Sequence, residues 1–238
     1  MIIKLRQFLF HFSLRHPNFA AVVRRCSYYF WRMSLFFRVR SKLDPDTLLY
    51  VDPDDINTYL GGKAGNRFYS RGKVKDGDWD LDSGKFKGWD IHQAIHDHYL
   101  RNVPWSETRY YKRALAHLKH EKLLRGENDI DAIFKRIEIL HDSILANGLK
   151  SMKEWPEIDG AHWETLDKFA SHDDITVSID RDGRFMLQDG KHRLSITKLL
   201  QLKSIPVAVG FRHKKWVDFR NEIQSFCNKR GSAYQPFT

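Results

Sequence analysis

The sequence predicts an α+β protein, and three observations support this class. One segment, Asp129–Asn147, keeps apolar residues at helical spacing over its whole length. A strand–hairpin–strand pattern follows at Ile175–Gln188, and a helix and a further strand complete this unit by Val209. The chain of 238 residues is 42% hydrophobic and 29% charged, which is ordinary for a globular protein with one sizeable core.

The first 43 residues carry most of the positive charge. Nine basic residues and no acidic residue precede Asp44, so only about +1 of the formal net charge of +10 belongs to the remainder. Ten aromatic residues are interleaved with these cations. Charges interrupt every apolar run, so none approaches the roughly 20 residues that span a bilayer. We expect a basic, aromatic-rich arm of two helical pieces over residues 1–43, divided at Pro17.

Three interpretations of this arm stay open. Aromatic rings at the headgroup boundary and arginines on lipid phosphates would place it on an anionic membrane surface. The same residues could bind nucleic acid, and this is the least favoured interpretation. The arm could also pack on the body of the protein. The two cysteines, Cys26 and Cys227, fit neither a zinc spacing nor a disulfide framework, so we expect a cytoplasmic protein, peripheral at the inner membrane face if the arm binds lipid.

Residues 44–128 are expected to form a mostly helical middle region with one Asp/Gly loop. Thr47–Val51 is typical of a short strand, and Asp52–Ile56 indicates a turn into a helix start. The chain from Gly61 to Gly88 lacks periodicity, which predicts a long ordered loop. Helices are expected from Trp89 to about Asn102 and from Pro104 to about Leu124.

The expected loop contains alternating aspartates, in Asp76-Gly77-Asp78-Trp79-Asp80-Leu81-Asp82. Such carboxylates can converge on a hard cation, although Leu81 and Lys87 occupy the positions where an EF-hand needs Gly and Glu. Asp78 or Asp80 could therefore ligate a nucleotide-bound Mg²⁺. The alternative is turn chemistry, in which aspartates accept hydrogen bonds from local backbone donors.

Two residues at the start of the second expected helix have proposed roles. Ser106 is expected to cap the helix by accepting hydrogen bonds from its first N–H groups. Glu107 follows it, at a position where a carboxylate complements the positive end of the helix dipole. Glu107 is also a candidate catalytic base.

The segment Asp189-Gly190-Lys191-His192-Arg193 carries the strongest chemical signal. It joins an expected strand to an expected helix, so free N–H groups of the first helical turn can bind an anion. Gly190 allows a phosphate to approach the backbone closely. Basic residues here oppose the helix dipole, which indicates a bound anion. The alternative makes Asp189 a helix cap and leaves the cations solvated.

Each residue type in this segment fits a role in phosphate chemistry. Lys191 and Arg193 can supply charge-assisted hydrogen bonds to phosphate oxygens. His192 can donate to a phosphate or move a proton. Asp189 can hold Mg²⁺ or polarise an attacking hydroxyl group.

A second cationic and aromatic cluster follows the last expected strand, Ile205–Val209. It comprises Arg212-His213-Lys214-Lys215-Trp216. Arg212 and His213 could cover the base or ribose of a bound nucleotide. The cluster could instead begin a final helix.

Two blocks of the chain resemble the ParB/sulfiredoxin superfamily. His141–Leu149, with Ser143-Ile144 and Asn147-Gly148-Leu149, resembles a helix end of ParB proteins. The block from Ile175 through the Asp189–Arg193 turn to Ile205-Pro206-Val207 resembles the superfamily core. The resemblance implies a small mixed sheet with flanking helices over residues 129–238. It also implies nucleotide phosphates at the turn, held by Asp189, Gly190, His192 and Arg193.

The branches of this superfamily imply different reactions. Sulfiredoxins have a catalytic Cys where this chain has Lys191, and the paired arginines and helix-turn-helix of the DNA clamps are not found here. The turn is closest in character to the kinase branch, with its His shifted by one position. The resemblance therefore implies a phosphotransferase that uses ATP or CTP with Mg²⁺ and acts on a small-molecule or glycan hydroxyl. The alternative is a nucleotide-gated DNA-binding module.

Overall fold

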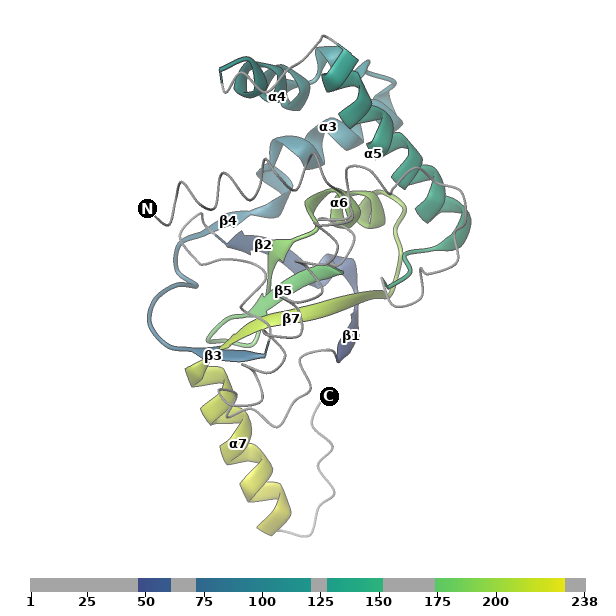
Figure 1. Ribbon diagram of the computed structural model, residues 1–238. Coiled ribbons are helices and arrows are strands. Elements are labelled where there is room, and N and C mark those ends of the chain that lie inside the picture. Colours follow the sequence, from purple (N-terminus) through teal and green to yellow (C-terminus); the bar gives the residue numbers. More distant parts are fainter. Residues whose placement is uncertain (1–46, 61–71, 121–127, 152–173, 230–238) are drawn as a thin grey trace, which may run out of the picture.

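Strands from two distant parts of the chain form one mixed sheet in an α+β fold. The computed structural model describes residues 47–60, 72–120, 128–151 and 174–229 (Figure 1). The seven strands found in these residues are β1 (Leu48–Val51), β2 (Ile56–Leu60), β3 (Lys73–Lys75), β4 (Ser83–Lys85), β5 (Ile175–Ile179), β6 (Phe185–Asp189) and β7 (Ile205–His213). The α-helices found in the same residues are α3 (Asp90–Arg101), α4 (Arg109–His120), α5 (Asn128–Asn147), α6 (Lys191–Leu199) and α7 (Lys214–Lys229).

The sheet order is β1-β7-β5-β6-β2-β4. The long strand β7 runs parallel to β5, and β5 forms an antiparallel hairpin with β6. On the other edge of β7, β1 pairs with its first half and β3 with its last three residues. Strands β1 to β4 thus share one sheet with β5 to β7. The expected boundary between residues 128 and 129 therefore does not separate two domains, and the expected arm, residues 1–43, lies outside the described residues.

Helix α6 lies between the sheet and a layer formed by α3 and α5 (Figure 1). Leu194 is fully buried in the sheet core, where it joins Val177 and Leu187. Ile196 is fully buried in the helical core beside Ile95 and Phe134. Two residues within one turn of this short helix thus belong to different cores, which fixes the position of the helix.

The strongly periodic segments form the expected elements. The helices expected over residues 89–102 and 129–147 correspond to α3 and α5, and the expected hairpin corresponds to β5 and β6. Helix α6 begins at Lys191, directly after the glycine turn. Within the part of the chain that the structure describes, no helix is both long and apolar enough to cross a membrane.

Three expectations for the middle region were wrong in detail. The turn after β1 forms only the 3₁₀ turn η1 (Pro53–Asp55), because Ile56 enters β2 and pairs with β6. The described part of the expected loop contains β3, β4 and the 3₁₀ turn η3 (Phe86–Gly88). Ser106 lies inside a third 3₁₀ turn, η4 (Trp105–Glu107), and Thr108 caps α4 instead, since its hydroxyl accepts a hydrogen bond from the N–H of Tyr111 at 3.2 Å.

Gly190 holds the start of α6 against strand β5. Its φ of 92° lies in the left-handed region, and a Cβ atom there would be 3.0 Å from the Cα atom of Ile175. Both the backbone conformation and the close approach disfavour any side chain here. The glycine is therefore needed to join β6 to α6 at this distance from the sheet.

We expect Gly190→Ala to lower the free energy of unfolding by about 2–4 kcal/mol. The new Cβ atom would crowd the backbone of Ile175, and alanine would be strained at this left-handed φ. Gly148→Ala is the matched control, since Gly148 has a φ of 69° but a Cβ atom added to it would meet no other atom within 4 Å. Gly148→Ala should lower the free energy of unfolding by about 1–2 kcal/mol, because only the left-handed backbone strain applies there. Urea unfolding measures both. Equal losses would contradict the role of the Ile175 contact.

Candidate functional site at the start of helix α6

The first turn of α6 receives no side-chain hydrogen bond from its N-cap residue. Gly190 occupies the N-cap position and has no side chain to accept hydrogen bonds from the following N–H groups. The carboxylate of Asp189 accepts from the N–H of Gly190 at 2.8 Å, one residue before the helix. The positive end of the helix is therefore left available to an anion.

Lys191 is held half-buried between aromatic rings. Its ammonium nitrogen lies 5.2 Å from the ring centroid of Tyr110 and 5.8 Å from that of Trp89. Trp89 in turn stacks on Tyr59, with ring centroids 4.3 Å apart and an interplanar angle of 8°. These contacts are within the range of cation–π attraction and restrain the side chain beside the helix terminus. Lys191 is therefore not a freely solvated cation.

His192 is a neutral hydrogen-bonding group at physiological pH. Its Nε2 atom lies 3.3 Å from the hydroxyl of Tyr110, which joins α6 to α4. Although part of the residue reaches the surface, burial lowers the pKa of His192 to about 3, and the charges of Lys191 and Arg193 lower it further. The imidazole can accept or donate one hydrogen bond, but it adds no charge to the site.

Helices α3 and α4 bring further charges to the same neighbourhood. Asp90, the buried first residue of α3, accepts a hydrogen bond from Arg113, and the Nε atom of Arg109 lies 3.6 Å from it. Both arginine side chains are largely exposed. Arg109 neighbours Tyr110 in α4, and Asp90 neighbours Trp89, so this pair of arginines lies close to the aromatic contacts of Lys191.

These additional residues were missed because their contacts depend on how α3, α4 and α6 pack. One signal was available: Arg109 and Arg113 are basic residues in the first turns of a helix, as are Lys191 and Arg193 in α6. Basic residues near a helix N-terminus oppose the helix dipole. This property singled out the α6 turn, and α4 has it too.

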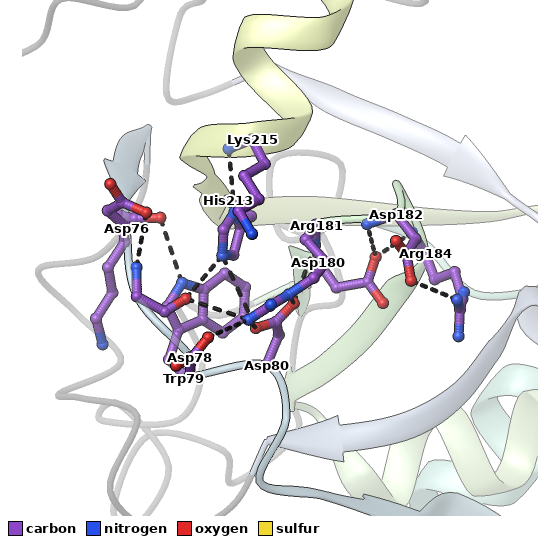
Figure 2. A network of polar contacts seen from close by, with 12 residues as sticks. Asp76, Asp78, Trp79, Asp80, Asp180, Arg181, Asp182, Arg184, His213 and Lys215 are labelled. Atoms are coloured by element: carbon purple, nitrogen blue, oxygen red, sulfur yellow. Dashed lines mark hydrogen bonds and ion pairs between the residues drawn. The ribbon is translucent and has the colours of Figure 1, made fainter.

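Asp78 and Asp80, two of the expected magnesium ligands, bind an arginine instead (Figure 2). The Nε and Nη2 atoms of Arg181 donate to the two oxygens of Asp80 at 2.8 and 2.7 Å, and Nη2 also donates to Asp78 at 2.8 Å. Hydrogen bonds from the side chain and the backbone N–H of Arg181 lower the pKa of the buried Asp80 to about 2, despite the opposing effect of its burial. One guanidinium group thus binds two carboxylates in this network.

His213 belongs to the same network and is fully committed to it. Its Nε2 atom lies 2.8 Å from the carbonyl of Gly77, and Nδ1 lies 3.1 Å from the N–H of Lys215 (Figure 2). The partners assign the proton to Nε2, because Nδ1 must accept from the backbone N–H. With 1% of its surface exposed, His213 has no atom left to cover a nucleotide.

The expected ligand residues lie at two ends of the sheet. Asp189 pairs with Thr176 at the start of β5, whereas Arg212 pairs with Ile179 at its end. A strand advances about 3.3 Å per residue, so the five residues of β6 separate Asp189 from the 180–184 turn by about 13 Å. The aspartates bound to Arg181 therefore cannot share one Mg²⁺ with Asp189. In the described residues, no group of three or more His, Cys, Asp or Glu side chains has metal-site geometry.

The third candidate catalytic residue, Glu107, lies in η4, directly before α4. Its side chain is exposed, and its backbone N–H donates to the carbonyl of Pro104 at 3.0 Å. The structure thus brings together Asp189, Gly190, Lys191, His192 and Arg193 as neighbours. It places Arg212 and His213 at the other end of the sheet.

We expect Asp80→Asn to lower the free energy of unfolding by about 2–3 kcal/mol at neutral pH, because it removes the buried carboxylate and leaves Arg181 only the exposed Asp78. The lowered pKa of Asp80 stabilises the fold fully above about pH 4, and this contribution is lost as the pH falls through 2. Urea unfolding between pH 5 and 2 should therefore show a shallower acid loss in the variant than in the wild type. Asp182→Asn, which breaks the exposed pair with Arg184, should cost under about 1 kcal/mol. Similar losses in the two variants would contradict the structural role of Asp80.

Comparisons of this chain with protein-family models, with curated proteins and with solved structures give no match. The contacts at the start of α6 are therefore the observations from which a function is inferred.

Proposed function

We propose that this protein binds the phosphate groups of a nucleotide at the start of α6 and transfers a phosphoryl group to a hydroxyl acceptor. One observation carries the proposal. The uncapped, glycine-preceded turn presents backbone N–H groups, and the side chains beside it are held half-buried by Trp89 and Tyr110. Cations that merely covered a solvated helix start would not need these contacts.

The residues of the turn suit different parts of a phosphate group. The N–H groups of Lys191 and His192 and the Lys191 ammonium can bind oxygens near the backbone, and Arg193 can bind two oxygens at once. Exposed Arg109 and Arg113 add positive charge at the rim of this site. Phosphoryl transfer depends mostly on positioning and on compensation of charge, which such an arrangement supplies.

Asp189 is the proposed base that accepts the proton of the hydroxyl acceptor. It is half-buried and adjoins Gly190, so its carboxylate lies next to the proposed phosphate site. His192 is a weaker candidate, because the low pKa of its imidazole makes it a poor proton acceptor. Since Asp78 and Asp80 do not fit a magnesium site shared with Asp189, no step is assigned to a metal ion at these residues.

The order of elements supports the resemblance on which the nucleotide class rests. A hairpin, β5–β6, leads through the glycine turn into α6 and then into the long strand β7. This is the order implied by a ParB/sulfiredoxin-like core, and the nucleotides that its different branches bind account for the choice of ATP or CTP. A small molecule or a glycan is the proposed acceptor.

We expect ATP or CTP at one hundred times its Kd to raise the Tm of the wild type by about 5–10 °C. Arg193→Ala should weaken nucleotide binding about 10–100-fold, because it removes a charge-assisted hydrogen bond. A thermal-shift series with and without Mg²⁺ measures both effects. The control is Arg184→Ala, whose arginine is exposed at the hairpin turn. A nucleotide that binds wild type and Arg193→Ala equally would place binding elsewhere.

Asp189→Asn should separate binding from transfer. Asparagine can still accept the hydrogen bond from Gly190, so the Kd for the nucleotide should stay close to that of the wild type. Loss of the base should lower kcat about 100-fold or more. The assay follows nucleoside diphosphate release with glycerol, a hexose and a hexosamine as acceptors. Equal transfer by wild type and variant would contradict the role of Asp189, and absence of transfer by the wild type to any acceptor would contradict the proposed reaction.

A further inference from the structure

Two arginines, one in β7 and one in α7, lie at the end of the sheet opposite the start of α6, where α7 packs on β7. Arg212 lies near the end of β7, between Val74 of β3 and Ile179 of β5, and only 8% of it is exposed. Arg220 lies in the second turn of α7, and its Nε atom is buried without a hydrogen-bond partner in the described part of the chain. The backbone of Arg212 pairs with β3 and β5, but no hydrogen bond or ion pair joins its side chain to another described residue.

The electrostatics of this pair are unfavourable without a counter-charge. Burial lowers the pKa of Arg212 to about 10, and the positive charge of Arg220 lowers it further. Both guanidinium groups still carry their protons at neutral pH. Buried charges in proteins are normally paired with an opposite charge, and buried donors are normally hydrogen-bonded. Asp78 and Asp80, two carboxylates at this end of the sheet, are bound to Arg181 (Figure 2).

Helix α7 is placed so that a small anion could join it to the sheet. The ring of Trp216 packs against the hairpin turn, since a Cβ atom on Gly183 would lie 2.8 Å from it. Arg220 is four residues further along α7 and hence on the same face as Trp216. No residue of α7 is fully buried, so few contacts hold this helix to the sheet.

We propose that Arg212 and Arg220 bind a phosphate-type dianion, as inorganic phosphate or as the phosphate of a monoester, and that the bound anion holds α7 against β7. Two guanidinium groups can supply several N–H donors in planar pairs that match phosphate oxygens. A dianion compensates both charges, whereas a monocarboxylate would leave one uncompensated. This site lies at the hairpin end of β5 and goes beyond the proposed nucleotide site at the start of α6.

The test uses the full-length protein carrying Arg193→Ala, which removes the principal phosphate contact proposed at α6. Orthophosphate and glycerol phosphate are each titrated against chloride at matched ionic strength, because salt alone screens charge. We expect orthophosphate at ten times its Kd to raise Tm by about 3 °C. Amide hydrogen exchange in α7 should slow in parallel. A response to glycerol phosphate as well would identify a site open to phosphorylated molecules, and a response to orthophosphate alone would identify a site for the free ion.

Arg220→Gln, in the same background, should abolish both responses. Lys215→Gln is the matched control, because it removes one exposed positive charge from the same helix. Arg212→Gln should abolish the same responses as Arg220→Gln. If Arg212→Gln does not fold, Arg220→Gln alone decides the test. Orthophosphate responses that are equal in Arg220→Gln and Lys215→Gln would overturn the proposal, as would unchanged hydrogen exchange in α7. Because α6 is already altered, failure of the proposed nucleotide site would leave this result unaffected.

Discussion

The contact between Gly190 and the backbone of Ile175 is the constraint on which the rest of the structure depends. It brings the start of α6 so close to β5 that Leu194 enters the sheet core and Ile196 enters the helical core. Once α6 is held on both sides, its first turn has a defined position relative to α3 and α4. The contacts of Lys191 and His192 with aromatic residues follow from that position.

Charged residues around the sheet differ in whether a partner within the fold compensates them. At the hairpin end, Arg181 binds Asp80 and His213 binds the carbonyl of Gly77, and these bonds connect the 76–82 segment to the β5–β6 turn and to β7. At the helix end, the N-cap residue of α6 is a glycine, which offers the first N–H groups no side-chain acceptor. The acidic 76–82 segment is thus explained by Arg181 within the fold. Compensation by neighbours, rather than residue type, separates structural charges from candidate ligand contacts.

The sequence predicted the parts of the fold in which local pattern decides structure. Helices α3 and α5 and the hairpin β5–β6 have clear periodicity and were confirmed. Strands β3 and β4 have three residues each, too few to show alternation. They form because their backbones pair with the edges of β7 and β2. The bond between Asp80 and Arg181 joins residues 101 positions apart, and Tyr110 meets His192 over 82 positions. No local pattern contains such contacts, so the α6 turn was predicted but its aromatic and acidic surroundings were not.

The most direct test of the central claim is the ¹H–¹⁵N spectrum of the full-length protein during titration with ATP or CTP. If phosphate groups bind at the start of α6, the backbone amides of Lys191, His192 and Arg193 should show the largest chemical-shift changes, with their protons moving downfield as they donate to phosphate oxygens. Nucleotide binding that leaves these three amides unchanged, and instead shifts amides elsewhere, would contradict the account.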